Sequence, residues 1–90
     1  MTVGDMIEEV EAWHKETFPN VTMADCLDKL KEEVSELEDS IGLPNWPEEL
    51  ADVALVVFAL AGRYGVDLEK EMRVKFAVNK QRGIEGRWKQ

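Results

Sequence analysis

Two pairs of acidic residues lie close together near the middle of the sequence. Glu33 and Glu36 form the first pair, and Glu49 and Asp52 form the second, each with three positions from one acid to the next. On a helix, this spacing places both carboxylates on neighbouring turns of one face, where like charges repel. A hard divalent cation would offset the repulsion, because it prefers carboxylate and water oxygens as ligands. The two pairs therefore indicate either a metal site or a solvated acidic face.

Basic and amide side chains recur at helical spacing toward the C-terminal end. Lys75, Asn79 and Arg82 continue the face of a predicted helix that begins with apolar residues. Such groups are suited to holding phosphate oxygens. The alternative is an amphipathic helix whose basic side chains reach into solvent.

The net charge of −8 is distributed unevenly along the chain. Residues 1–69 hold 17 acidic and 4 basic side chains, whereas residues 70–90 hold 2 acidic and 7 basic ones. The acidic excess argues against binding of a nucleic acid polymer. An acidic body with a basic end suits a site that holds both metal ions and a polyanion.

Length and composition predict one domain over residues 1–90, with residues 83–90 as a C-terminal tail. The single cysteine, Cys26, cannot form an internal disulfide, which fits a reducing cytosol. The longest uncharged stretch, residues 53–62, is about half of what a membrane helix needs. We therefore predict a cytoplasmic protein that does not enter a membrane.

The apolar periodicity predicts an all-α fold of four helices, over residues 3–17, 23–41, 47–64 and 67–82. N-caps are expected at Thr2 with Asp5, at Thr22 with Asp25 and at Asp67, and a left-handed C-cap is expected at Gly65.

The second helix has an apolar seam for packing against other helices, and the third helix carries more apolar surface than a short chain can cover. The second helix has a seam at alternating steps of four and three, formed by Met23, Leu27, Leu30, Val34, Leu37 and Ile41. The third helix is apolar around its whole circumference over residues 53–61. We predict a four-helix bundle that completes its core by oligomerisation.

Short connections make consecutive helices antiparallel neighbours. The turn between the second and third helices should therefore bring the four acids together. The fourth helix is expected to run back along the third, and so to deliver Lys75, Asn79 and Arg82 toward them. This arrangement would place phosphate-binding groups opposite a metal ion.

Three stretches resemble the MazG-like all-α nucleoside triphosphate pyrophosphohydrolases. They are Glu32-Glu33-Val34-Ser35-Glu36-Leu37, Glu49-Leu50-Ala51-Asp52-Val53 and Lys75-x-x-x-Asn79-x-x-Arg82. Trp13 with Phe18-Pro19 is also similar to a small phage and bacterial branch of dATP/dGTP pyrophosphohydrolases. The resemblance implies a homodimer or homotetramer encoded by a bacterium, an archaeon or a phage. It also implies hydrolysis of a nucleoside triphosphate between the α- and β-phosphates, with Mg²⁺ as cofactor and Mn²⁺ as a substitute.

The resemblance also assigns roles to individual residues. Metal ligands would be the four acids Glu33, Glu36, Glu49 and Asp52, with Glu36 also orienting or deprotonating the attacking water. Lys75, Asn79 and Arg82 would bind the phosphates. Lys29 would touch a phosphate or form a helix-surface ion pair with Glu33. Trp13, Phe18 and Trp46 would stack on the base or pack in the core and the turn.

Two other classes of protein compete with this interpretation. A di-iron carboxylate bundle needs Glu-x-x-His pairs on two helices, but the one histidine, His14, lies on the first helix. We expect His14 to be a packed neighbour of the core and not a zinc ligand. A non-catalytic helical interaction module would use the apolar third helix to bind a partner and the acids only for solubility.

Overall fold

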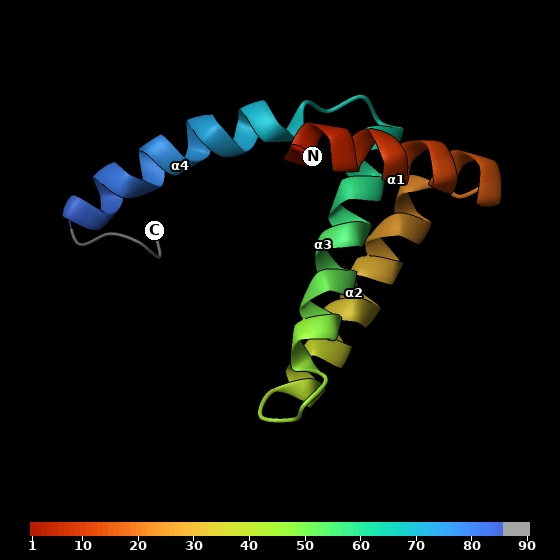
Figure 1. Cartoon of the computed structure of the whole chain (residues 1–90), viewed down its shortest axis with the longest axis horizontal. Helices are drawn as coiled ribbons and strands as arrows, with labels where there is room; N and C mark the ends of the chain where they lie inside the picture. The colour runs from red at the N-terminus through yellow and green to blue at the C-terminus, as the bar shows by residue number, and fades with distance from the viewer. Residues whose placement is uncertain (86–90) are drawn as a thin grey trace.

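The computed structural model describes residues 1–85, which form four helices and no strand (Figure 1). The helices are α1 (Val3–Thr17), α2 (Met23–Ser40), α3 (Trp46–Arg63) and α4 (Leu68–Ile84). The all-α prediction is confirmed for these residues, and the predicted helix bounds differ by at most two positions. The predicted tail begins too early, because α4 continues to Ile84. Trp88 and the rest of residues 86–90 lie outside the described part of the chain.

Threonine–aspartate pairs begin the first two helices, as the sequence predicts. Thr2 Oγ1 accepts the Asp5 N–H at 3.0 Å, and Asp5 Oδ2 accepts the Thr2 N–H at 2.9 Å. Thr22 and Asp25 repeat this reciprocal pair at 3.2 and 3.0 Å. Each capping box satisfies two backbone donors that a helix start would otherwise leave unpaired.

A tight turn pairs α2 with α3. The Leu43 N–H donates to the Ser40 oxygen at 2.8 Å, and Gly42 adopts a φ of +86°, which L side chains rarely adopt. The two helices therefore run antiparallel as a hairpin, and α1 crosses the end of this hairpin away from the turn (Figure 1). Both α1 and α2 pack against α3, which is the central helix.

Gly62 allows α1 and α3 to approach closely. A Cβ at this position would lie 2.6 Å from Glu11 Cβ and 3.4 Å from Glu11 Cα. Because the first distance is shorter than real contacts and the second involves backbone, the two helices would have to separate.

The prediction that the fourth helix runs back along the third within one chain is wrong. After α3, Gly65 takes a φ of +65°, and Val66 N–H donates to the Ala61 oxygen at 2.9 Å. This left-handed cap ends α3 as predicted and redirects the chain. The Gly4 N–H then donates to Glu69 Oε2 at 3.0 Å, which holds the start of α4 against α1. Beyond that contact α4 extends away from the hairpin (Figure 1).

The described chain buries little apolar surface. Its buried hydrophobic residues are Ile7, Cys26, Ala59 and Ala61, and no large side chain is fully buried. The predicted seam of α2 lies only partly inside: Leu27, Val34 and Ile41 are exposed, because α2 packs on α3 through the neighbouring positions Cys26, Glu33 and Ser40. None of the described helices is long and apolar enough to span a membrane.

We expect Gly62→Ala to destabilise the protein by about 1–3 kcal/mol, because the added methyl overpacks the α1–α3 crossing. The measurement is the midpoint of urea unfolding at fixed protein concentration. Gly83→Ala is the matched control, since a Cβ there meets nothing within 4 Å, and alanine favours a helix by about 1 kcal/mol. Equal midpoints for the two variants would contradict the close approach.

Candidate functional site

Three of the four predicted acids come together on the α2–α3 hairpin. Glu33 and Glu36 project from α2, and Glu49 projects from the first turns of α3. One carboxylate oxygen from each lies within 4.8 Å of the others. We call these three residues the acidic cluster. Their proximity follows from the antiparallel pairing that the Ser40–Leu43 turn imposes.

The acidic cluster is partly buried and incompletely paired. Glu33 is only 7% exposed, and its Oε1 forms an ion pair with Lys29 Nζ at 3.0 Å. Oε2 of Glu33 and Oε2 of Glu49 are buried without a hydrogen-bond partner. Buried carboxylate oxygens without a donor or a cation carry a desolvation cost. Two buried oxygens of the cluster are therefore left without a compensating donor.

Like charges perturb Glu36, which is exposed at the rim of the cluster. A hydrogen bond to Glu33, followed by the charge of Glu33, raises the pKa of Glu36 above its ordinary value. The raised pKa means that Glu36 retains a proton more readily beside its neighbours than it would alone. The acids act on Lys29 as well. Its hydrogen bond to Glu33 raises the pKa of the Lys29 ammonium group and so favours the charged form.

The acidic cluster fits a divalent cation by its donor chemistry. It offers three hard oxygen donors, and two of its buried oxygens have no other partner. Asp52, the fourth predicted ligand, does not join the three acids. It lies one turn beyond Glu49, is exposed, and lines the adjoining pocket. A role for Asp52 as a ligand stays a prediction.

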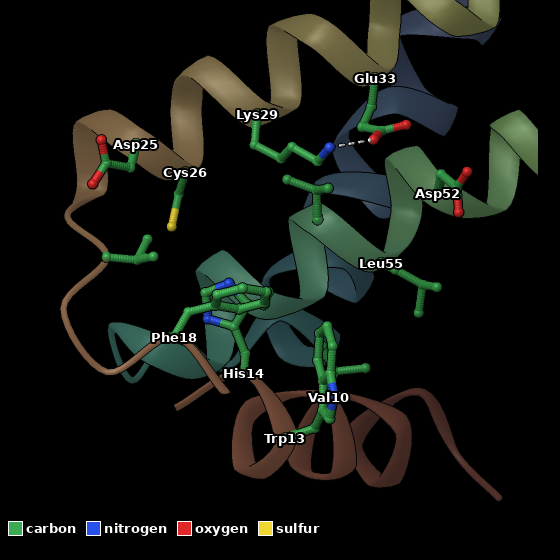
Figure 2. A pocket seen from close by; sticks show the side chains of 13 residues that line it. Val10, Trp13, His14, Phe18, Asp25, Cys26, Lys29, Glu33, Asp52 and Leu55 are labelled. Carbon is green, nitrogen blue, oxygen red and sulfur yellow. Dashed lines mark ion pairs between the residues drawn. The ribbon is translucent and has the colours of Figure 1, made fainter. Parts of the chain in front are cut away.

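A pocket of about 550 Å³ lies between α1 and α2, next to the acidic cluster (Figure 2). Its floor is α3, and the loop between α1 and α2 closes one end. Most of the lining is apolar, as is usual for pockets that bind small molecules. The lining residues are Val10, Trp13, His14, Phe18, Val21, Asp25, Cys26, Lys29, Glu33, Asp52, Leu55, Val56 and Ala59.

Two of the three aromatic candidates lie at this pocket. Trp13 and Phe18 meet edge to face with ring centroids 5.7 Å apart, and they remain 57% and 43% exposed. Neither is a core residue, so both rings are available to a ligand. Trp46 begins α3 beside the hairpin turn and does not line the pocket. Lys29 lines the pocket and also forms the predicted ion pair with Glu33.

The predicted phosphate-binding residues of α4 are not brought to the site within one chain. Lys75, Asn79 and Arg82 belong to α4. Beyond its contact with α1, this helix extends away from the hairpin (Figure 1). The charge pattern that singled them out gave no information on the direction of α4. Their role in binding phosphate stays a prediction.

Sequence reasoning did not find several residues that line the pocket. His14 is half-buried as expected, but it lines the pocket beside Trp13. A signal was present, because His14 lies in the last turn of α1, one position after Trp13 and shortly before Phe18, the residue that ends the helix. Arg63 was also missed, and it hydrogen-bonds to His14 from α3. Nothing in the spacing of Arg63 relates it to residues on α1.

A sequence profile described as dATP/dGTP pyrophosphohydrolase matches residues 6–89, a range that includes the acidic cluster and every residue of the pocket. The chain belongs to the dATP/dGTP pyrophosphohydrolase family. This result confirms the resemblance that the acidic motifs indicated, including the branch suggested by Trp13 and Phe18.

Two phage relatives, each named dATP/dGTP diphosphohydrolase, align over 81 residues. The protein of Salmonella phage PMBT28 is 32% identical, with 90% of this chain and 27% of the phage protein covered. The protein of Cyanophage S-2L is 35% identical, with 90% of this chain and 76% of the phage protein covered. The chain thus spans about a quarter of the first relative and about three quarters of the second. No solved structure shows a significant match.

We expect Mg²⁺ or Mn²⁺ to stabilise the protein through the acidic cluster. A cation at 100 times its Kd would add about 2.7 kcal/mol to the free energy of unfolding. Glu36→Gln should abolish this gain while leaving the metal-free protein as stable or more stable, because it removes a repelling charge. Thermal unfolding with and without the cation measures both effects.

Glu38→Gln is the matched control, since Glu38 lies on the same helix, is exposed and is not part of the acidic cluster. This variant should keep the full response to the cation. A Glu36→Gln protein that still responds like the wild type would show that the cation binds elsewhere.

Proposed function

We propose that the chain hydrolyses dATP and dGTP between the α- and β-phosphates, giving the nucleoside monophosphate and pyrophosphate, in a reaction that depends on Mg²⁺. The observation that carries the proposal is the juxtaposition of the acidic cluster with a pocket of nucleoside size. Glu33 belongs to both features. Both phage relatives carry the name dATP/dGTP diphosphohydrolase, which supports the choice of substrate.

The base and sugar would occupy the apolar part of the pocket. Its volume of about 550 Å³ lies within the range of small-molecule sites. Trp13 and Phe18 offer exposed aromatic faces, and a base stacked on an aromatic ring gains about 1–3 kcal/mol. Lys29, Glu33 and Asp52 lie at the other end of the lining (Figure 2). The triphosphate would therefore point toward the acidic cluster.

The acidic cluster would hold Mg²⁺, with Asp52 as a fourth ligand if its side chain turns toward Glu49. A bound Mg²⁺ neutralises phosphate charge and lowers the pKa of a coordinated water. Glu36 is the most exposed of the three clustered acids, so it is our choice for the group that receives a proton from water. Water adds across the α–β anhydride bond, Glu36 takes the proton, and pyrophosphate leaves with the bonding electrons.

The phosphate-binding groups would come from α4 of a second copy. The basic segment, residues 70–90, carries charge complementary to that of the acidic hairpin. α4 has no buried residue and exposes an apolar row, with Phe76 at 62%. α2 exposes a second apolar row, with Met23 at 47% and Leu27 at 42%. A homodimer or homotetramer would cover both rows, and α4 could then bring Lys75, Asn79 and Arg82 to the partner's acids.

The same exposed apolar rows suit a non-catalytic interaction module, which is the alternative function. That module would place no demand on Glu36 or on a cation. The buried, unpaired oxygens of Glu33 and Glu49 favour the enzyme, because a face used only for solubility has no reason to bury carboxylates.

We expect purified protein with Mg²⁺ to convert dATP and dGTP to monophosphate and pyrophosphate, and EDTA to stop the reaction. Glu36→Gln and Asp52→Asn should each lower kcat by about 100-fold or more with the fold intact, because each removes a group assigned to proton transfer or metal binding. Chromatography of the products, with circular dichroism of each variant, makes the test.

Glu38→Gln again serves as the control and should retain wild-type turnover. Release of diphosphate and orthophosphate would place the cut at another bond. Absence of hydrolysis for every nucleotide would transfer the assignment to the interaction module.

Mixing inactive variants tests whether two chains share each site. Glu36→Gln chains and Lys75→Ala/Arg82→Ala chains, refolded together, should recover about a quarter of wild-type activity in a symmetric dimer, since half the dimers then contain one intact site. A mixture of Glu36→Gln and Asp52→Asn chains should stay inactive, because both acids come from one hairpin. Equal inactivity of both mixtures would mean that each site uses one chain only.

A further inference from the structure

Arg63, the last residue of α3, forms three polar contacts that the proposed chemistry does not use. Its Nη2 donates to the backbone oxygens of Pro19 at 3.2 Å and Val21 at 3.0 Å. Its Nη1 lies 3.3 Å from Nδ1 of His14. One guanidinium thus ties the end of α3 to both α1 and the loop that carries Phe18.

These contacts determine which nitrogen of His14 carries the proton. A guanidinium has only donors, so Nδ1 must be the unprotonated acceptor of the Arg63 bond. The neutral ring then carries its proton on Nε2, which is the nitrogen left for a ligand. Burial of the ring, and next the positive charge of Arg63, lower the pKa of His14 and favour this neutral form.

The surroundings hold the imidazole ring in place at the pocket. Trp13 packs against it edge-on with centroids 6.1 Å apart, and Phe18 lies tilted at 5.4 Å. His14 lines the pocket together with both aromatic residues. A fixed N–H donor beside two aromatic rings provides the hydrogen bond and the stacking surface that bind a flat heterocycle.

Other titratable groups of the pocket do not replace Arg63 as the partner of His14. They are Asp25, Cys26, Lys29 and Glu33 from α2, and Asp52 from α3. Lys29 and Glu33 pair with each other, and Asp25 accepts the Thr22 N–H at the start of α2. Among the described residues, Arg63 is the side chain that hydrogen-bonds to the His14 ring.

We infer that Arg63 is a positioning residue that fixes His14 as an Nε2–H donor to N7 of a purine base in this pocket. The inference rests on the proposed function, because it names how the same site selects its base. Adenine and guanine both present N7 as an acceptor, whereas pyrimidines have no such atom. A donor aimed at N7 therefore accepts both purines and gives no advantage to either pyrimidine.

Nitrogen NMR tests the positioning role directly, because His14 is the single histidine of the chain. With ¹⁵N-histidine, the wild-type ring should show an unprotonated Nδ1, a protonated Nε2 and a pKa below the ordinary value of about 6.5. Arg63→Met should mix the tautomers and raise that pKa. An Nδ1–H ring in the wild type would overturn the inference, and this result needs no variant to fold.

Nucleotide analogues test the contact to the base. Addition of dATP in EDTA should shift the Nε2 resonance, and 7-deaza-dATP, in which C–H replaces N7, should shift it less. With Mg²⁺, 7-deaza-dATP and 7-deaza-dGTP should show about tenfold lower kcat/KM than their parents, since a buried donor loses its acceptor. His14→Phe should lower kcat/KM for the parents and abolish this difference.

The outcomes separate this inference from the proposed function. Hydrolysis of dATP with equal kcat/KM for the 7-deaza analogue would overturn the N7 contact and keep the enzyme. A dATP-dependent shift of Nε2 without hydrolysis would keep the contact and reject the reaction. Neither shift nor hydrolysis would reject both.

Discussion

Electrostatic repulsion among three carboxylates is the constraint on which the rest of the structure depends. The α2–α3 hairpin brings one oxygen each of Glu33, Glu36 and Glu49 within 4.8 Å of one another, and it buries Oε2 of Glu33 and Oε2 of Glu49 without a hydrogen-bond partner. Lys29 offsets part of this cost through its 3.0 Å ion pair with Glu33. A single ammonium cannot neutralise three acids, so the acidic cluster of the hairpin keeps an excess of negative charge. A divalent cation has the charge and the ligand preference to remove that excess.

The second constraint on the structure is the apolar surface that the chain leaves uncovered. Within residues 1–85, four small or medium residues form the buried hydrophobic core, and α4 buries none of its side chains. A core of that size rarely stabilises ninety residues alone. The proposed second copy would supply both the missing apolar contacts and the missing positive charge. Its apolar helices would cover the exposed rows, and its basic α4 would approach the acidic hairpin.

Helix caps and turns, which depend on residues close together in the sequence, were predicted well. Thr2, Thr22 and Gly65 act through atoms a few positions away, so the sequence alone placed the caps, the helix ends and the turn that gathers the acidic cluster. The direction of α4 depends instead on Gly4 meeting Glu69, sixty-five positions later. Arg63 and His14 likewise meet through the α1–α3 crossing. No periodicity encodes such contacts, so the path of α4 was predicted wrongly and the contact between Arg63 and His14 was missed.

Charge and shape together assign a direction to the proposed substrate. Trp13, His14 and Phe18 form a weakly charged aromatic end of the pocket, whereas Lys29 and Glu33 form a charged end beside the acidic cluster (Figure 2). A purine nucleotide has the same polarity, with a flat neutral base at one end and phosphates at the other. Since α1, α2 and α3 hold both ends of the pocket, one chain would suffice to orient the proposed nucleotide. A second copy would then be needed to complete the phosphate contacts and not to choose the base.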